Sequence, residues 1–445
     1  MTLRSLALGV SLHLLFFSCQ ADSDPIVAPA AALDVLLNEH GGPDAFRLPA
    51  ADDLEALPQD PRNPLSPAKV ALGQLLFHET AIATNGKTEE GIGTFSCASC
   101  HFAGAGFQAG RFQGIGDGGL GFGVNGEGRR PHEAVPFADF DVQPIRSPSA
   151  LNTAYQEVML WNGQFGATGV NAGTEDRWTP GTPKETNTLG YEGLETQAIA
   201  GLTVHRMALD ARHAEELGYR DLFQAAFPGI EDTKLFTPEY AGLAIAAYER
   251  TLVADQAPWQ RYLRGEEEAL NPDALQGAIL FLGKAGCVSC HTGPALSSNT
   301  FHALGMDDLV DCEEPTIGTR VDNAENLGRG GFTGKADDNY RFKVPQLYNL
   351  KSSPFYGHGS SFRTVRDVIA YKNRAEPQNA RVPAGSLSDE FQPLGLTEEE
   401  IDQLAAFVRD GLYDPNLERY APLSLPSGQC FPNNDDRSRK DLDCY

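Results

Sequence analysis

The stretches SCASCH (96–101) and CVSCH (287–291) carry the same pattern, Cys-x-x-Cys-His, once in each half of the 445-residue chain. The whole sequence has eight cysteines and ten histidines, so the two copies use half of all the cysteines. Chance is a poor explanation for two copies of a five-residue pattern at such a cysteine content. The repeat therefore indicates one chemical purpose that is served twice.

Covalent haem attachment explains every position of the repeat. A disulfide-exchange site needs one Cys-x-x-Cys and no histidine after it, and zinc would need a fourth ligand close to each motif. In a c-type cytochrome the two thiols bond to the porphyrin vinyl groups and the adjacent histidine binds the iron. We therefore predict two c-type haems, haem 1 on Cys97, Cys100 and His101 and haem 2 on Cys287, Cys290 and His291.

The residues before each motif predict a helix. In PAKVALGQLLFHE (67–79) and NPDALQGAILFLGKAGC (271–287), apolar residues recur with helical spacing. Two more amphipathic helices are expected at 237–253 and at 396–412, the second with a capping-box pattern at its start. Helix, short loop and haem motif thus occur twice. This predicts a mainly α fold with two tandem cytochrome-c-like helical domains, each with one covalently bound haem, and long loops between them.

The first twenty residues have the features of an export signal. Arg4 precedes an apolar run over 6–17, which is too short to span a bilayer and has the length of a signal-peptide core. Cys19 follows a small residue, as in bacterial lipoprotein cleavage sites, where it would become the lipidated first residue. Cleavage near Ala21 without lipidation is the alternative. Both routes predict an exported protein of the periplasm or outer cell envelope, where c-type haem is attached.

Five segments are expected along the chain. They are a signal peptide (1–19), an N-terminal linker (20–64), a haem 1 domain (65–250), a haem 2 domain (251–420) and a C-terminal tail (421–445).

The charge excludes some partners. A formal net charge of −25 argues against nucleic acid and against anionic lipid as docking surfaces. No segment after the signal is apolar enough to span a membrane, so membrane contact is expected only through a lipid anchor. The glycine-rich stretch 110–131 does not follow a strand with phosphate-loop spacing, so we expect a long surface loop near haem 1 rather than a nucleotide site.

Several stretches resemble the bacterial diheme cytochrome c peroxidase and MauG superfamily, in particular its MauG-like subgroup. Besides the two motifs they are, in chain order, LGQLLFHETAIATNG, RSPSALNTAY, LWNGQFG, LETQAIAGL, RFKVPQLYNL and SPFYGHGSSFRTVRDV. The resemblance implies that H₂O₂ reacts at haem 1, and that haem 2 passes electrons or stores an oxidising equivalent. It also implies a Ca²⁺ ion between the haems.

Three residues are implied to act in catalysis. Trp161 matches the family's tryptophan between the haems, where its π-system relays electrons; a packed core tryptophan is the alternative. The family's distal glutamate at haem 1 is missing, and His205 and Arg206 occupy its region. We predict that His205 moves the peroxide proton and that Arg206 stabilises developing charge. Adjacent helical residues point about 100° apart, so only one of the two need face the haem.

The sixth ligand of haem 2 is open between Tyr371 and Met306. The family places a Met or Tyr on the helix that follows the SPFYGHGSS stretch, and strict spacing would put Lys372 at that position. Packing in the core or exposure to solvent is the alternative role of each. His358 matches a family histidine near haem 2, where it would bond a propionate or the backbone.

The remaining positions of interest are less determined. His132 matches a loop that supplies a removable sixth ligand to haem 1 in some relatives, although exposure to solvent is the simpler expectation. Arg146 stands where the family has a calcium-binding Asn, which puts the calcium site in doubt. Cys430 and Cys444 could close a small loop outside the cytoplasm, which would leave Cys312 as an odd thiol.

Three functions are consistent with these residues. In the MauG-like version, the haems oxidise a side chain of a partner protein with H₂O₂. In the cytochrome c peroxidase version, a small cytochrome or copper protein donates electrons and H₂O₂ is reduced to water. In the third version both irons are six-coordinate and the protein is a plain electron carrier. The missing distal glutamate and the unusual haem 2 helix favour the first version.

Overall fold

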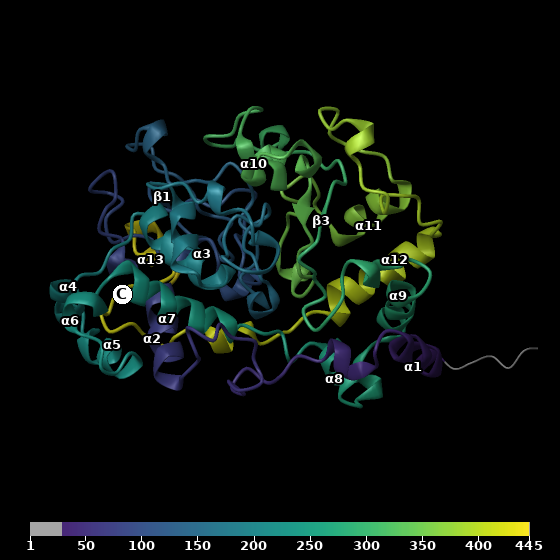
Figure 1. The fold of residues 1–445 in the computed structure, drawn as a ribbon, viewed down its shortest axis with the longest axis horizontal. Helices are drawn as coiled ribbons and strands as arrows, with labels where there is room; N and C mark the ends of the chain where they lie inside the picture. Colours follow the sequence, from purple (N-terminus) through teal and green to yellow (C-terminus); the bar gives the residue numbers. More distant parts are fainter. Residues whose placement is uncertain (1–28, 445) are drawn as a thin grey trace, which may run out of the picture.

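Two lobes lie side by side along the long axis of the molecule (Figure 1). The computed structural model describes residues 29–444, so the expected signal peptide, with Cys19, lies outside the described residues. The first lobe contains α2 (Pro67–His78), α3 (Gly193–Val204), α4 (Ala211–Glu216), α5 (Arg220–Ala226), α6 (Asp232–Leu235), α7 (Pro238–Arg250), α13 (Asp436–Asp441), β1 (Gly119–Leu120) and β2 (Arg130–Pro131). The second lobe contains α1 (Pro29–Glu39), α8 (Pro258–Leu263), α9 (Pro272–Leu282), α10 (Arg329–Thr333), α11 (Val365–Arg374), α12 (Glu398–Ala406), β3 (Phe301–His302) and β4 (Phe342–Lys343).

The helices expected from the sequence are present. α2 and α9 begin after Ser66 and Asn271, whose side chains each accept a hydrogen bond from a backbone amide three residues on. α12 begins with a capping box formed by Thr397 and Glu400, and a π-helical turn, Phe407–Gly411, continues it. The two pairs β1–β2 and β3–β4 are short and antiparallel. The prediction of a mainly α fold is confirmed.

The helix before each motif packs against a later helix through a glycine. α2 meets α7 at Gly73, where a Cβ atom would lie 1.9 Å from the carbonyl oxygen of Ala244. α9 meets α12 at Gly277, where a Cβ atom would lie 2.1 Å from the carbonyl oxygen of Gln403. No other residue fits at such distances, so both helix pairs depend on glycine. The same arrangement thus occurs twice, and the two tandem domains with one haem in each stay a prediction.

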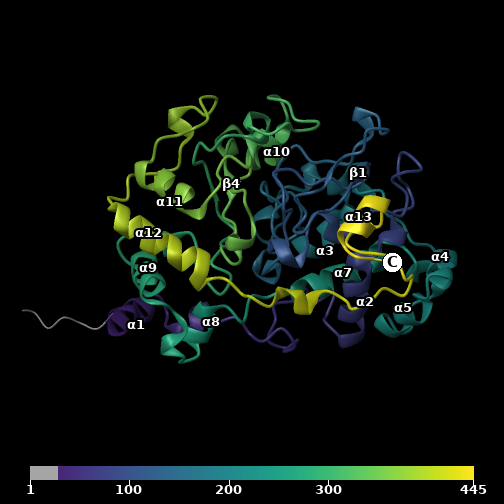
Figure 2. The ribbon, with the colours of Figure 1, turned by 180° about the vertical axis from the view of Figure 1, so that it is seen from behind.

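Each end of the described chain packs on the lobe of the opposite end. α1, from the segment expected as a linker, contacts α9, and the ring of His40 lies 3.1 Å from the carbonyl oxygen of Leu282. The tail returns to the first lobe, where α13 lies in both views (Figures 1 and 2). There the Ser96 hydroxyl donates a 2.9 Å hydrogen bond to the carbonyl of Pro432. The chain ends therefore join the lobes instead of extending from them.

The tail covers only the first half of the glycine-rich loop, so the expectation of a surface loop is right in part. Residues 112–119 are buried, whereas Val124, Asn125 and Glu127 are exposed. The amides of Phe122 and Gly123 each donate a 3.0 Å hydrogen bond to Asp441 of α13, so the tail supplies acceptors for amides of this loop. A disulfide between Cys430 and Cys444 closes the tail, one of the pairings considered from the sequence.

One cluster of buried apolar residues runs through both lobes, so they share a core. Among residues 29–444, no helix combines the length and the apolar character that crossing a membrane requires.

Candidate haem-binding sites

Both Cys-x-x-Cys-His motifs fold into the same short turn. A 3₁₀ turn spans Cys97–Ser99 in the first motif and Cys287–Ser289 in the second. In each motif the histidine amide donates to the carbonyl of the first cysteine, at 3.1 Å for His101 and 2.9 Å for His291. Two distant segments have thus adopted one local geometry.

The two motif histidines are oriented as iron ligands need to be. Nδ1 of His101 lies 3.2 Å from the carbonyl oxygen of Phe107, and Nδ1 of His291 lies 3.0 Å from that of Leu296. A carbonyl only accepts, so Nδ1 carries the proton and Nε2 keeps its lone pair for a metal. Burial lowers the pKa of each imidazole to about 4, so both are neutral at pH 7.

The motif thiols fit covalent attachment better than the alternatives. All four are free of disulfides among the described residues. Burial raises the pKa of Cys97 to about 12 and that of Cys287 to about 11, which keeps both thiols neutral. Within residues 29–444, no three His, Cys, Asp or Glu side chains converge as a metal-ion site, so the zinc alternative has no support. The residues present fit two c-type haems.

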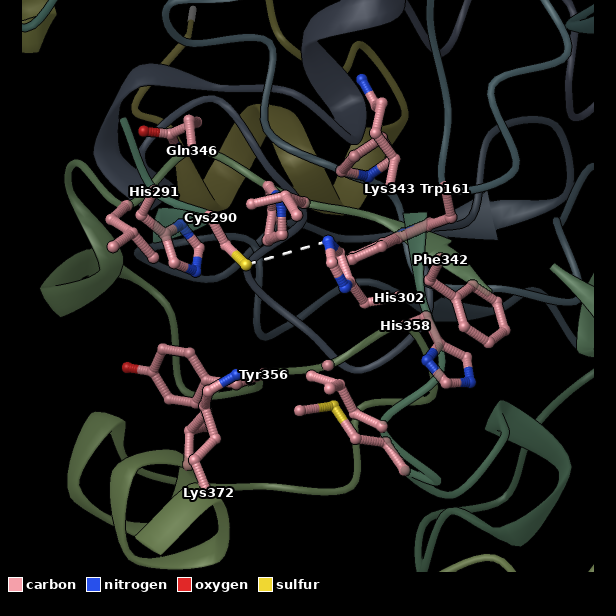
Figure 3. Close-up of a pocket in the computed structure, with 18 of the residues that line it drawn as sticks. Trp161, Cys290, His291, His302, Phe342, Lys343, Gln346, Tyr356, His358 and Lys372 are labelled. Carbon is pink, nitrogen blue, oxygen red and sulfur yellow. Dashed lines mark hydrogen bonds between the residues drawn. The ribbon is translucent and has the colours of Figure 1, made fainter. Parts of the chain in front are cut away.

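A cavity of about 290 Å³ opens against the second motif. Figure 3 shows Cys290 and His291 on one side of it and Lys372 on the opposite side. Met306 also lines it, and most of the wall is apolar. An apolar slot that begins at a Cys-x-x-Cys-His turn suits a flat macrocycle held from one edge.

Trp161 lies between the two motifs. Its ring lines the cavity at the second motif, and its Nε1 donates a 2.8 Å hydrogen bond to the carbonyl of Arg146. The next residue, Ser147, approaches the first motif at Gly114, where an added Cβ atom would lie 2.9 Å from the Ser147 hydroxyl and 2.7 Å from Sγ of Cys100. The indole is therefore hydrogen-bonded to a segment that runs near the first motif.

His205 stands beside the first motif with a carboxylate behind it. Its Nδ1 lies 2.8 Å from Oδ2 of the buried Asp141. Burial alone would lower the pKa of His205, but the charge and the hydrogen bond of Asp141 raise it overall. The loop over residues 114–116 runs between this pair and the motif: a Cβ atom on Gly116 would lie 2.4 Å from Oδ2 of Asp141, and one on Gly114 would lie 2.7 Å from Sγ of Cys100. A carboxylate-backed imidazole near the iron position can accept and return a proton.

Arg206 is held in a different way. Its guanidinium pairs with the buried Asp117 and donates to the carbonyl of Asp139, and its backbone has φ 59°. This left-handed residue ends the helical course after α3 and turns its side chain toward the glycine-rich loop. The arrangement makes Arg206 an anchor for that loop, and its charge is already neutralised by Asp117.

The candidates for the sixth ligand of haem 2 lie in different surroundings in the structure. Met306 and Lys372 line the cavity, whereas Tyr371 does not. The Tyr371 hydroxyl donates to the carbonyl of Leu304, and its ring packs in a small cluster with Phe362 and Phe391.

Two other predicted histidines have defined surroundings. His358 is buried in the cavity wall, with Nε2 3.1 Å from Oδ1 of Asp308 and its ring stacked on Phe342 at 3.6 Å. His132 lies beside the hairpin strand β2, where its Nδ1 accepts a 3.2 Å hydrogen bond from the amide of Ala134. Its side chain is directed to its own turn.

The position of the family's calcium ligand does not fit a metal. The guanidinium of Arg146 is buried and donates to the Arg111 carbonyl at 2.9 Å, to the Gln108 side chain at 3.0 Å and to the Ser353 hydroxyl at 2.7 Å. Burial lowers its pKa, but only to about 10, so it stays charged at pH 7. A second cation next to a buried guanidinium would be repelled.

Several functional neighbours were not predicted. Asp117 comes from the glycine-rich stretch that was expected on the surface, and Asp141 follows shortly after that stretch. No local pattern marks either as a partner of the residues after α3. Lys343 is also new: its buried amine donates a 2.8 Å hydrogen bond to the carbonyl of Val158, and its backbone amide donates at 2.8 Å to the carbonyl of Trp161. Burial lowers the pKa of Lys343 to about 7.

Comparison with known proteins agrees with this geometry. A profile of the family described as di-haem cytochrome c peroxidase matches residues 67–268. The chain is 28% identical over 380 residues to the methylamine utilization protein MauG of Methylorubrum extorquens, which covers 84% of each chain. It is also 28% identical over 380 residues to the cytochrome-c peroxidase IdrP1 of Denitromonas iodatirespirans, covering 81% of this chain and 86% of the relative.

The fold has solved counterparts as well. The crystal structure of a MauG-like protein associated with microbial copper homeostasis covers 83% of this chain and 95% of its own, with a TM-score of 0.58 and 24% identity. At that identity the likeness concerns the fold, which agrees with the sequence matches. Residues 67–268 therefore match the di-haem cytochrome c peroxidase family, and over most of its length the chain is similar to proteins named MauG and cytochrome-c peroxidase, which supports a peroxide-dependent diheme oxidoreductase.

Proposed function

We propose that this chain is an exported MauG-like enzyme that uses H₂O₂ to oxidise a side chain of a partner protein. Haem 1 would be attached at Cys97 and Cys100, and haem 2 at Cys287 and Cys290. A haem held at the first motif would supply the iron at which peroxide reacts. The observation that carries the proposal is the His205–Asp141 pair beside the first motif, at 2.8 Å.

His205 supplies the acid–base chemistry of the peroxide step. Because Asp141 accepts from Nδ1, the Nε2 lone pair of His205 is free to accept the proton of the peroxide oxygen that approaches the iron. The same nitrogen returns the proton to the departing oxygen, which leaves as water. Asp141 stabilises the imidazolium between these two steps. Arg206 keeps the loop that bears Asp141 in place through Asp117.

Trp161 connects the two haem sites. Its ring borders the cavity at the second motif, and its hydrogen bond to Arg146 leads through Ser147 to Cys100. An indole is readily oxidised, so it can carry an electron from the haem 2 side toward haem 1. His358 packs near the indole, with ring centroids 6.3 Å apart, and fixes this wall of the cavity.

The MauG-like version and the cytochrome c peroxidase version differ in where the electrons come from. The absence of the family's distal glutamate and the departure of α11 from the Met or Tyr of its relatives favour a partner side chain as the source. In the peroxidase version, a small cytochrome or copper protein would donate instead. The carrier version would need a permanent sixth ligand on haem 1. The candidate for that ligand is His132, whose Nδ1 accepts a hydrogen bond from the Ala134 amide.

Export places this chemistry outside the cytoplasm, in the periplasm or outer cell envelope. Cys19 would provide a lipid anchor, and the acidic surface would select a partner with a basic docking face. Calcium has no part in the proposal, because the Arg146 guanidinium fills its position.

One experiment tests the proposal on the purified full-length protein. Intact mass should show two haems, and equimolar H₂O₂ without a donor should produce a rapid, long-lived change in the visible spectrum. Slow turnover with reduced cytochrome c would then agree with a partner side chain as the electron source. Brisk turnover would support the peroxidase version, and no response to H₂O₂ would support the carrier.

A further inference from the structure

α11 presents one face to the cavity at the second motif. The cavity lining includes Val365, Val368, Ile369 and Lys372 from this helix, which are spaced at i, i+3, i+4 and i+7. Residues with this spacing share one side of a helix. Three of the four are β-branched and apolar, as expected for a wall around a macrocycle. The fourth is a lysine, whose amine therefore needs an explanation.

The amine of Lys372 has no partner among the described residues. No hydrogen bond or ion pair involves its Nζ in this part of the chain. Figure 3 shows the side chain rising from α11 into the cavity, opposite His291 and Cys290.

The other candidates are held differently. Tyr371 points away from the cavity, with its hydroxyl bonded to the carbonyl of Leu304. Met306 lines the cavity as Lys372 does, but it also packs against the cluster of Phe362, Tyr371 and Phe391. Lys372 instead belongs to the face of α11 that forms the cavity wall.

We propose that the amine of Lys372 is the axial ligand of the haem 2 iron on the face opposite His291. The inference rests on the proposed haem attachment at the second motif. On binding, the ammonium loses one proton to solvent and the nitrogen lone pair forms the bond to iron; no atom changes oxidation state. An uncharged amine on the iron also removes the cost of an unpaired ammonium in an apolar cavity. Haem 2 would then be six-coordinate and low-spin, which keeps peroxide chemistry at haem 1.

The test uses the full-length diheme protein and its variant Lys372→Ala. Electron paramagnetic resonance and near-infrared magnetic circular dichroism report the spin state and the ligand pair of each ferric haem. We expect Lys372→Ala to keep two haems by intact mass but to lose the low-spin signal of one haem, and added imidazole to restore a low-spin signal. Met306→Leu, Tyr371→Phe and Lys284→Ala serve as controls; Lys284 lies in the same lobe and already pairs with Glu400. All three should retain the wild-type signals.

Retention of the low-spin signal in Lys372→Ala would overturn the proposal, as would its loss in Met306→Leu. If Lys372→Ala does not accumulate, Lys372→His decides: altered low-spin g values support ligation, and unchanged g values refute it. A wild-type mass that lacks a haem would instead refute the attachment assumed in the proposed function, so the two failures are distinguishable.

Discussion

Nε1 of Trp161 donates a 2.8 Å hydrogen bond to the carbonyl oxygen of Arg146, and this contact joins the two candidate haem sites. The indole belongs to the wall of the second site, while the residue after Arg146 borders Cys100 of the first. The Trp161 carbonyl in turn accepts from the amide of Lys343. The tryptophan is therefore fixed at both its ring and its backbone, as a relay between fixed redox centres requires.

The first prediction concerns this relay. Trp161→Phe keeps an aromatic ring but removes the N–H donor and an easily oxidised π-system. The response of haem 2 to H₂O₂ should slow by at least about tenfold, which corresponds to a barrier rise of about 1.4 kcal/mol. Stopped-flow absorbance at the haem 2 bands measures it. Trp178→Phe is the matched control, because Trp178 also donates from its indole, to Thr174 at 3.2 Å, but far from both motifs. Equal rates in wild type and Trp161→Phe would remove the indole from the path.

The second prediction concerns the proton step. His205→Gln should lower the rate of reaction with H₂O₂ by about 10²- to 10⁴-fold, the usual contribution of a general acid–base group. His213→Gln is the control, since His213 also faces a carboxylate, Asp210, at 3.3 Å on an exposed helix. A full rate in His205→Gln would assign the proton transfer to another group.

The pH dependence follows from the same pair. Asp141 raises the pKa of His205 against the effect of burial. The imidazole must be neutral to accept a proton, so the rate should fall as the pH drops through this raised pKa. Asp141→Asn removes the negative charge and lowers the pKa, and the acid limb of the rate profile should move to lower pH. An acid limb that stays in place would show that a different group titrates.

Much of the fold could be predicted from the sequence because it depends on residues that are close together in the chain. The two motifs, the helices at 67–79 and 271–287, and the capping box at Thr397 each depend on residues within a few positions of one another. The partners of His205 and Arg206 could not be predicted, because they come from a loop more than sixty residues away in sequence. The glycine-rich stretch 110–131 was expected on the surface because its glycines suggest a flexible turn. No neighbouring residue predicts that the distant tail covers part of it.

The sixth ligand of haem 2 shows the same limit. Spacing identified the neighbours Tyr371 and Lys372 on one helix, and Met306 from an earlier segment was a further candidate. Which of the two helix residues enters the cavity depends on how that helix is rotated about its axis. In the structure Tyr371 points to a separate aromatic cluster and Lys372 to the cavity. A rotation of about 100° per residue separates them, and tertiary packing alone determines it.

The third prediction concerns the buried cation between the lobes. Arg146→Gln removes a guanidinium that ties Arg111 and Gln108 of the first lobe to Ser353 of the second. The free energy of unfolding should fall by about 2 to 4 kcal/mol, because several buried acceptors lose their donor. Urea denaturation followed by circular dichroism measures the loss.

Two controls separate this role from metal binding and from general damage. EDTA should leave the wild-type unfolding midpoint unchanged. Arg329→Gln removes another buried guanidinium that is held by carbonyl oxygens, among them that of Gly163 at 3.0 Å, and should destabilise to a similar degree. Only Arg146→Gln should also shift the reduction potentials of both haems, and toward more negative values, since a nearby positive charge favours the reduced iron. Unchanged potentials would show that Arg146 acts through packing alone.

The last prediction concerns the tail that covers the first motif. The hydroxyl of Ser96 donates to the carbonyl of Pro432, and the disulfide between Cys430 and Cys444 closes the segment that follows this contact. The bridge spans 14 residues, and a loop of that size restricts the unfolded chain by about 3 kcal/mol. The double variant Cys430→Ser/Cys444→Ser should therefore lose about 3 kcal/mol of stability in urea.

Limited proteolysis of this double variant should cut the tail first. The control Cys312→Ser, which removes a free thiol, should behave as wild type. The tail binds the glycine-rich loop that carries Asp117, and the Asp117 carbonyl accepts a 2.9 Å hydrogen bond from the amide of Asp141, so release of the tail should also slow the reaction with H₂O₂. A variant with normal proteolytic resistance would show that the hydrogen bonds of the tail hold it without the bridge.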